Sequence, residues 1–186
     1  DAFFAREGAG ISDLPQGAVV GSASLRRQAQ ILAARPDLRV VNFRGNVATR
    51  LRKLAEGEVD ATLLAVAGLK RLGAAEKITA PLAPEVMLPA VAQGAIGLEI
   101  REGDASTGAW LDAIACRETA QRVGAERALL AELDGSCKTP IAGLAELLEG
   151  GKTLRLRGLV ALPDGTKVHR AEISGPADDG AALGQA

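Results

Sequence analysis

Short apolar runs recur along the first half of the chain, with polar segments between them. They cover residues 18–21, 40–43 and 61–66. Apolar runs of this length are typical of strands that are buried on both faces of a sheet. Each run is separated from the next by a segment that has apolar residues at helical spacing. Strands that alternate with helices predict an α/β domain with a mixed, mostly parallel sheet and helices on its faces.

The ends of the first two predicted helices are marked by capping residues. Ser24 precedes apolar residues at positions 25, 29 and 32, and Asn46 precedes apolar residues at positions 47, 51 and 54. Ser and Asn are favoured there because their side chains accept hydrogen bonds from free N–H groups of the first helical turn. Pro36 and Gly57 end the two helices. A third, shorter helix is predicted near residues 69–72.

The pattern changes in the second half of the chain. Prolines at positions 81, 84 and 89 interrupt the alternation, and residues 95–100 then predict one more strand, which we expect to cross between domains. Helices are predicted over residues 110–115 and 118–133. Two turn signals, Gly150-Gly151 and Asp164-Gly165, are typical of hairpins. They predict a small α+β domain with a three-stranded antiparallel sheet, formed by residues 141–148, 154–162 and 168–173.

Composition and charge narrow the functional classes. Aromatic residues make up only 2% of the chain, so the core has to be built from Ala, Val, Leu and Ile. A net charge of -1 gives no general attraction to nucleic acid or to an acidic membrane. The charge is uneven, because residues 21–53 contain eight basic residues and one acidic residue. This concentration favours a dedicated anion site.

Four arginines lie where a predicted strand ends and a helix begins: Arg26, Arg27, Arg44 and Arg50. Helix N-termini attract anions through their unpaired N–H groups and their partial positive charge. Arginine adds paired donors for carboxylate or phosphate. Ser22 and Ser24 add hydroxyl donors, and Gly45 lets the backbone approach a ligand closely. The remaining arginines of this region are interpreted as solvent-facing: Arg35, Arg39 and Arg52.

Cys137 lies in a polar loop, after Gly135 and Ser136 and before Lys138. A neighbouring lysine favours the thiolate, which is the nucleophilic form of cysteine. From these residues alone, a reactive thiol and an incidental one are equally compatible with the sequence.

The other cysteine and the single histidine give less specific signals. Cys116 lies in an apolar helical stretch and is predicted to be a packed core residue. Two cysteines are too few for a disulfide framework, and they suggest a reducing, cytoplasmic compartment. His169 has no cluster of acidic residues or cysteines beside it in the sequence, so no metal site is predicted.

Five stretches of the sequence carry a resemblance to a known family: residues 21–28, residues 43–51 with their Arg-Gly-Asn-Val core, residues 65–73, residues 88–94 and the cysteine loop. In this order they resemble the hydroxymethylbilane synthases, also called porphobilinogen deaminases, nearly end to end. The resemblance implies a transferase of tetrapyrrole biosynthesis. Such an enzyme polymerises porphobilinogen into hydroxymethylbilane with loss of ammonia.

The resemblance also implies a cofactor, a dipyrromethane attached to Cys137 through a thioether. Every pyrrole ring of this cofactor bears acetate and propionate groups, which would explain the arginines. Arg71 matches a position of the family that binds substrate. The matches to cofactor-binding positions are Ser22, Ser24, Arg26, Arg27, Arg44, Arg50 and Gln93.

A domain arrangement follows from the same resemblance. Residues 1–90 would form the second α/β domain, of the periplasmic-binding-protein type. Residues 91–115 would be a crossing segment that belongs to a mostly missing first domain, and residues 116–186 a C-terminal α+β domain that carries the cofactor loop and is incomplete at its end. The family's catalytic aspartate lies in a His-Ser-Xaa-Lys-Asp type motif of the N-terminal domain, which this sequence lacks. No catalytic residue is therefore assigned, and the chain alone is expected to be inactive.

The expected partners are porphobilinogen and the missing N-terminal domain, and the protein is expected to be a monomer without affinity for nucleic acid or membranes. Three departures from the family, Ala23, Ser136 and Lys138, remove no needed group, although Lys138 adds a charge beside the thiol. The alternative is a non-enzymatic anion-binding module of the periplasmic-binding-protein type, which has no use for a thiol at position 137. A nucleic-acid role is disfavoured by the net charge and by the few aromatic residues available to stack bases.

Overall fold

The computed structural model describes residues 1–136 and 138–186. The chain divides into two units, each with segments from several parts of the sequence. Unit 1 consists of Asp1–Pro89, Gly135–Ala142 and Leu159–Arg170, and unit 2 consists of Ala90–Asp134, Gly143–Gly158 and Ala171–Ala186. The cysteine loop is thus grouped with the α/β part of the chain.

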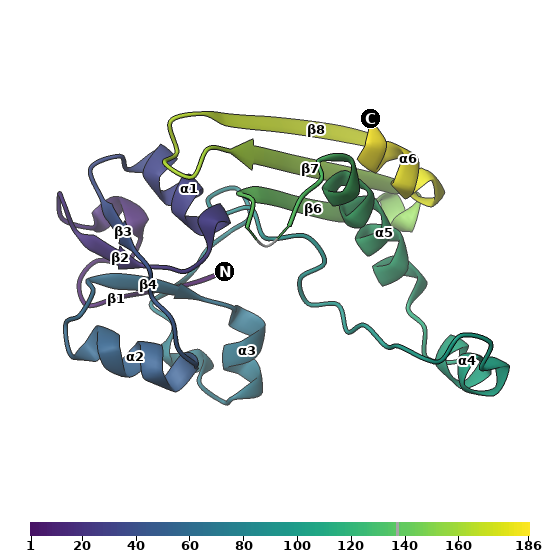
Figure 1. The fold of residues 1–186 in the computed structure, drawn as a ribbon, viewed down its shortest axis with the longest axis horizontal. Coiled ribbons are helices and arrows are strands. Elements are labelled where there is room, and N and C mark those ends of the chain that lie inside the picture. Colours follow the sequence, from purple (N-terminus) through teal and green to yellow (C-terminus); the bar gives the residue numbers. More distant parts are fainter. Residues whose placement is uncertain (137) are drawn as a thin grey trace. The chain divides into compact units, whose positions relative to one another are not determined.

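Unit 1 contains a five-stranded sheet with the order β3-β2-β4-β1-β5 (Figure 1). β2 pairs in parallel with β3 and β4, whereas β1 is antiparallel to β4 and to β5. Only β1 therefore runs against the other strands, and the mixed, mostly parallel sheet is confirmed. The strands are β1 (Ala2–Ala5), β2 (Val19–Gly21), β3 (Arg39–Val41), β4 (Ala61–Leu64) and β5 (Ala80–Pro81).

Helices cover both faces of this sheet (Figure 1). Successive residues of a strand point to opposite faces. Phe3 belongs to one hydrophobic cluster with Ile31 of α1, and Phe4 belongs to the other with Leu54 of α2. The helices are α1 (Leu25–Ala34), α2 (Val47–Ala55) and α3 (Val66–Arg71). The capping predictions are confirmed, because Ser24 accepts a hydrogen bond from Arg27 N and Asn46 accepts one from Thr49 N.

The segment that follows Pro89 differs from its predicted secondary structure. The strand predicted over residues 95–100 is wrong, because none of these residues is in a strand. Ile96, Leu98 and Ile100 keep the alternation of a strand, but they are 78%, 57% and 44% exposed. A strand needs a hydrogen-bonded neighbour, and none is paired with them. The next helix, α4 (Ala105–Asp112), begins earlier than predicted, because Asp104 caps it by accepting a hydrogen bond from Thr107 N at 3.0 Å.

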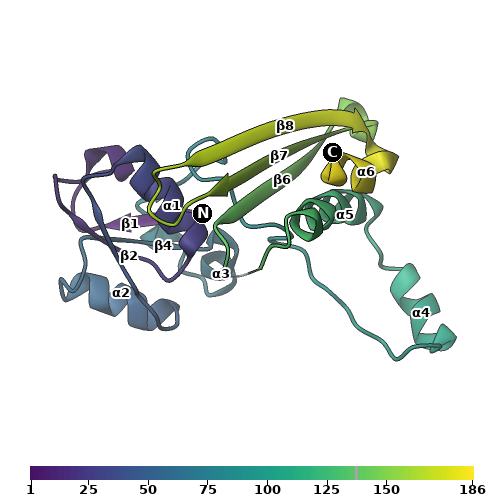
Figure 2. The ribbon, with the colours of Figure 1, turned by 45° about the horizontal axis from the view of Figure 1, so that its top comes forward.

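The second part of the chain contains a three-stranded sheet with the order β6-β7-β8, which confirms the predicted small α+β domain. In unit 2, α5 and α6 lie side by side against this sheet (Figure 2). Ala125 of α5 packs there with Ala145 and Leu154. The elements are α5 (Arg117–Glu132), β6 (Ile141–Leu148), β7 (Thr153–Ala161), β8 (Val168–Pro176) and α6 (Gly180–Gln185).

Cys116 corrects another prediction. It is exposed rather than packed, because it occupies the N-cap position of α5 instead of a helix interior. Thr119 donates its hydroxyl to the Cys116 Sγ at 3.2 Å, and this hydrogen bond lowers the pKa of the thiol. Within residues 1–136 and 138–186, no helix combines the length and the apolar character that crossing a bilayer requires.

Glu126 is a buried carboxylate in unit 2, only 6% exposed. Its Oε1 accepts a hydrogen bond from Ala145 N at 2.8 Å and its Oε2 accepts one from Ala92 N at 2.5 Å. Burial raises the pKa of Glu126. The carboxylate thereby ties α5 both to β6 and to the loop around Ala92, whose backbone has a positive φ of 57°.

Replacing Glu126 with glutamine is expected to lower the free energy of unfolding by about 1–3 kcal/mol. An amide offers one oxygen, so one of the two buried N–H groups would face an NH₂ group instead of an acceptor. Denaturant unfolding followed by circular dichroism measures the loss. Glu132→Gln is the matched control, since Glu132 is an exposed residue of the same helix. Equal stability of the two variants would contradict the structural role given to Glu126.

Candidate functional site

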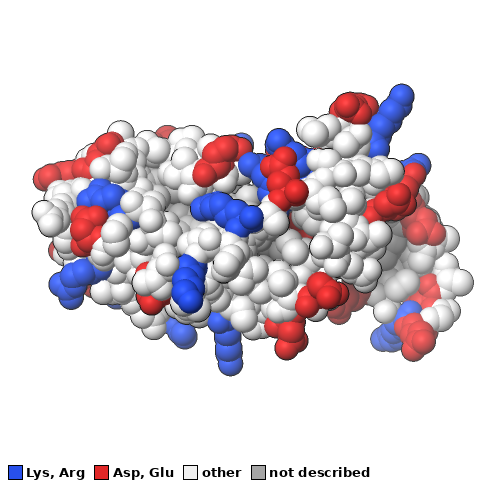
Figure 3. Space-filling model, turned by 90° about the horizontal axis from the view of Figure 1, so that it is seen from above, with Lys and Arg blue, Asp and Glu red and all other residues white. Residues whose placement is uncertain are grey.

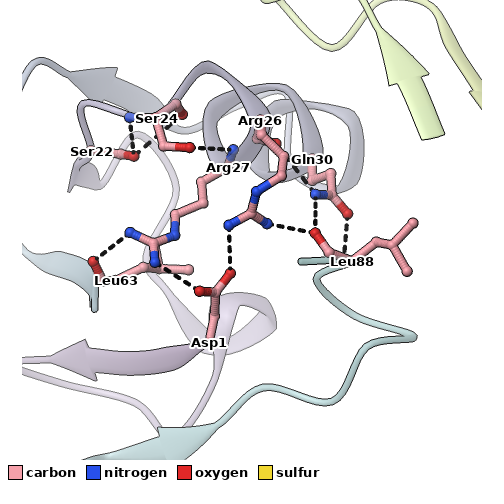
Figure 4. Close-up of polar contacts among 8 residues, drawn as sticks. All are labelled: Asp1, Ser22, Ser24, Arg26, Arg27, Gln30, Leu63 and Leu88. Atoms are coloured by element: carbon pink, nitrogen blue, oxygen red, sulfur yellow. Dashed lines mark hydrogen bonds and ion pairs between the residues drawn. The ribbon is translucent and has the colours of Figure 1, made fainter. Parts of the chain in front are cut away.

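The turn between β2 and α1 is held by its two serines (Figure 4). Ser22 is 5% exposed, and its N–H donates to Val41 O at 2.9 Å, which fixes the turn to β3. The Ser22 hydroxyl accepts a hydrogen bond from Ser24 N at 3.1 Å. Ser24 in turn caps α1 by accepting a hydrogen bond from Arg27 N at 3.4 Å. The two hydroxyls therefore shape the helix start at which the predicted anion site lies.

Arg26 and Arg27 point toward one carboxylate, that of Asp1 (Figure 4). The Arg26 Nη2 donates to Asp1 Oδ2 at 3.0 Å and the Arg27 Nη2 donates to Asp1 Oδ1 at 2.7 Å. Their Nη1 atoms donate to main-chain carbonyls, Arg26 to Leu88 O and Arg27 to Leu63 O. Two guanidinium groups thus share one carboxylate, and the cluster keeps a net positive charge.

The cluster of Arg26, Arg27 and Asp1 keeps positive charge and unpaired donors that an anion could use. Burial, and then the charge of Arg27, lowers the pKa of Arg26 to about 10, so Arg26 stays charged at neutral pH. Burial lowers the pKa of Arg27 as well. Among the atoms that the structure describes, the Nε of Arg26 and the Nε of Arg27 are buried without a hydrogen-bond partner. Unpaired buried donors favour a ligand that accepts hydrogen bonds.

The turn between β3 and α2 supplies two more cations. Arg44 is exposed, and its Nε donates to Asn42 Oδ1 at 3.4 Å. The Arg50 Nε donates to Gly45 O at 2.9 Å, which directs this side chain back to the helix start. Gly45 has a φ of +133°, and a Cβ there would lie 2.9 Å from the Cγ2 of Thr49, so a larger residue would not fit. Burial, and then the charge of Arg27, lowers the pKa of Arg50.

The loop that contains Cys137 is organised by its described neighbours, whereas Cys137 itself lies outside the described residues. The Thr139 hydroxyl donates to Ser136 O and accepts a hydrogen bond from Ser136 N, both at 2.7 Å. The Lys138 N–H donates to the Ser136 hydroxyl at 3.2 Å. These bonds connect Ser136 with Lys138 and Thr139, the described neighbours of position 137.

One cavity of unit 1, of about 340 Å³, joins these separate segments. It brings Lys138 of the cysteine loop to the same space as Arg44, although the two residues are far apart in the sequence. The cavity wall is cationic and polar, as a polycarboxylate requires. Its lining residues are Ser22, Ala23, Leu25, Gln28, Asn42, Arg44 and Lys138.

The face of the molecule that Figure 3 shows has no broad positive surface. On the face that Figure 3 shows, Lys and Arg side chains are intermixed with Asp and Glu side chains. Arg26 is 7% exposed, and the side chain of Arg27 is 14% exposed. The positive charge of residues 21–53 is therefore turned partly inward, which suits a small acidic ligand better than an extended polyanion.

Of the predicted site residues that the structure describes, only Ser22 and Arg44 line this cavity. Ser24, Arg26, Arg27 and Arg50 lie in the adjoining helix starts, outside its lining. Arg71 is exposed in the last turn of α3, and Gln93 is exposed in unit 2. Asp1, Gln28 and Asn42 were not among the predicted residues. Asp1 could not be found from the sequence, because its contacts depend on the pairing of β1 with β4. The described residues contain no group of three His, Cys, Asp or Glu side chains suited to a metal ion.

Two family models match the chain. One, described as "Porphobilinogen deaminase, dipyromethane cofactor binding domain", matches residues 1–109, and the other, "Porphobilinogen deaminase, C-terminal domain", matches residues 120–186. The chain belongs to the porphobilinogen deaminase family. Within this family it is similar to the porphobilinogen deaminase of Paracoccus denitrificans (strain Pd 1222), with 60% identity over 184 residues.

The porphobilinogen deaminase matches fit the site geometry. The match to the cofactor-binding domain covers both turns that carry the arginines and serines, and the match to the C-terminal domain covers the cysteine loop. The aligned region is 99% of this chain and 58% of the Paracoccus protein, so the chain spans little more than half the length of that relative.

Proposed function

We propose that the enzyme containing this chain is a hydroxymethylbilane synthase, which joins porphobilinogen units with loss of ammonia and serves tetrapyrrole biosynthesis. The observation that carries the proposal is the cavity at which the arginine turns meet the cysteine loop. A porphobilinogen unit bears an acetate and a propionate group. Arg44 and Lys138 offer two cations to such carboxylates, and Ser22, Gln28 and Asn42 add hydrogen-bonding groups.

The residues present fit a dipyrromethane cofactor. Cys137 would hold it through a thioether, and the cationic cavity beside Lys138 would receive its acidic side chains. When bound, the group supplies a nucleophilic pyrrole carbon for chain growth. The protein's own contribution is to orient two acidic partners for reaction, which requires fixed cations. We assign this binding to Ser22, Ser24, Arg26, Arg27, Arg44, Arg50 and Gln93, with Arg71 for the incoming substrate.

The catalytic carboxylate is not assigned to this chain. Positive charge develops on the pyrrole nitrogens during reaction, and a carboxylate has to stabilise it. Asp1 is unsuited to this role because its carboxylate is already shared between Arg26 and Arg27. We therefore expect the 186-residue chain alone not to turn over porphobilinogen. The monomeric state and the cytoplasmic location stay predictions.

We propose further that residues 91–115 belong to a domain completed by other residues of the full-length enzyme, with residues 1–90 and 116–186 as its α/β and C-terminal domains. Support comes from Ile96, Leu98 and Ile100, which alternate as in a strand and yet are exposed. Trp110, 75% exposed, lies in the same segment. Apolar residues gathered in this way are typical of a surface that another part of a protein covers.

The intact mass of the purified full-length enzyme, with peptide mapping of its cysteines, tests the proposed function. A dipyrrole-sized addition on the peptide of Cys137 is expected, and the peptide of Cys116 should carry none. Cys116 is a strict internal control because it is exposed and its thiol pKa is lowered. A Cys137 peptide without added mass, in a protein that still binds anions, would favour the alternative, a non-enzymatic anion-binding module.

A further inference from the structure

Asp1 is placed in the arginine cluster by the sheet. It directly precedes β1, and its main-chain carbonyl accepts a hydrogen bond from Leu82 N at 2.8 Å. β1 lies between β4 and β5, so the start of this strand is held on both sides. The Asp1 side chain is only 8% exposed. A buried carboxylate in a fixed position can orient the groups that bind it.

The hydrogen bonds of the two arginines show how much orientation Asp1 provides. Each guanidinium donates one Nη to a main-chain carbonyl and the other Nη to Asp1, at 3.0 Å from Arg26 and 2.7 Å from Arg27. Without Asp1, each group would keep a single anchor and could turn about it. With Asp1, both planes are fixed, and each buried Nε–H is left unpaired.

The charge balance shows that Asp1 does not simply neutralise the cluster. One carboxylate faces two guanidinium groups, so the pair remains cationic after both ion pairs form. A cluster built only for stability would be expected to balance its charges, because an excess buried charge is costly. The remaining charge and the free donors suit a further carboxylate, supplied by a ligand.

We propose that Asp1 is a positioning residue, which holds Arg26 and Arg27 in the orientation that binds a carboxylate of the acidic pyrrole. This inference rests on the proposed function for the identity of the ligand. The positioning role and the net charge predict opposite changes in anion affinity when the Asp1 carboxylate is removed. Removing the Asp1 carboxylate makes the chain more positive, which by charge alone strengthens anion binding, whereas loss of orientation weakens it.

The test compares Asp1→Asn with a matched control in the 186-residue chain. Asp37→Asn removes the same charge and also breaks a two-point Asp–Arg pair, in which Arg35 donates to Asp37 at 2.7 and 2.8 Å. Calorimetric titration with porphobilinogen is expected to show binding about tenfold weaker for Asp1→Asn, the loss of roughly one hydrogen bond to a charged group. Asp37→Asn should stay within about twofold of wild type.

Asp1→Glu keeps the carboxylate and the net charge but lengthens the side chain by one methylene group. Its affinity for porphobilinogen is expected to fall several-fold, because both guanidinium planes are displaced. It also replaces Asp1→Asn if that variant fails to fold. Wild-type affinity in Asp1→Glu, or tighter binding in a folded Asp1→Asn, would overturn the positioning role.

A readout without ligand separates this inference from the proposed function. In the NMR spectrum of the wild-type chain, the side-chain N–H signals of Arg26 and Arg27 should show slow rotation of both guanidinium groups. Asp1→Asn should make both rotate quickly, and Asp37→Asn should affect only Arg35. If the wild-type chain fails to bind porphobilinogen, the assignment of the ligand is wrong. If the signals of Arg26 and Arg27 do not change in Asp1→Asn, the positioning role is wrong.

Discussion

Replacing Cys137 with serine is expected to abolish both retention of a dipyrrole and turnover of porphobilinogen by the full-length enzyme. A serine hydroxyl at neutral pH does not offer the anionic nucleophile that a thiol provides. It therefore cannot form the thioether through which the cofactor is held. Intact mass of the purified variant and the rate of hydroxymethylbilane formation measure the two losses.

The matched control for this prediction is Cys116→Ser, since Cys116 is the only other cysteine of the chain. It should keep both the added mass and the activity, because Cys116 occupies the N-cap position of α5 without a side-chain capping bond and does not line the cavity of the arginine turns. An active Cys137→Ser variant would refute the covalent role of Cys137. Loss of activity in both variants would point instead to a general sensitivity of the fold.

Replacing Gly165 with alanine is expected to lower the free energy of unfolding by about 3 kcal/mol, since overpacking and backbone strain each cost about 1–3 kcal/mol. Gly165 lies in the turn between β7 and β8 and has a φ of +73°. A Cβ there would lie 2.5 Å from Ala33 N and 2.8 Å from Ala29 O, both in the backbone of α1. A helix backbone cannot move aside as a flexible side chain can.

Gly17→Ala isolates the part of this effect that comes from the backbone conformation. Gly17 has nearly the same φ, +76°, but a Cβ there would meet nothing within 4 Å. Its substitution should therefore cost only about 1–2 kcal/mol. Thermal or denaturant unfolding compares the two variants, and equal losses would mean that the turn does not press on α1 as the structure indicates.

The turn that contains Gly165 also contacts a residue of the candidate anion site. The turn contacts α1 at a second point, where the Gln28 side chain donates to Pro163 O at 3.1 Å. Gln28 is one of the residues that line the cavity. We expect Gly165→Ala to weaken anion binding as well as stability, because α1 carries Arg26 and Arg27 at its start.

The local structure of the site was determined by the sequence itself. Ser24 and Asn46 cap α1 and α2 as predicted, because an N-cap is a contact between residues close in the chain. The carboxyl ends of parallel strands meet at one edge of a sheet. The positions of Arg26 and Arg44 just after β2 and β3 were therefore enough to predict a common anion site.

Long-range partners could not be obtained in this way. β1 (Ala2–Ala5) was not predicted, and the place of Asp1 depends on the pairing of this strand with β4 and β5, which lie far along the chain. The cavity shared by Arg44 and Lys138 joins segments that no local pattern relates. At residues 95–100 a local pattern was present but the strand was not, since an alternating pattern becomes a strand only when another strand pairs with it.

The environment of Cys116 was likewise decided by the tertiary structure and not by the sequence pattern. An apolar helical stretch suggested burial for Cys116, yet the residue is exposed, because it lies at the N-cap position of α5 and not inside a packed helix. The sequence determined which local elements carry the predicted anion-binding residues and how their helices are capped, since both follow from side-chain chemistry and short-range hydrogen bonds. Only the tertiary structure decided which carboxylate faces the arginines and which loop closes the cavity, because those contacts depend on strand pairing and packing between distant segments.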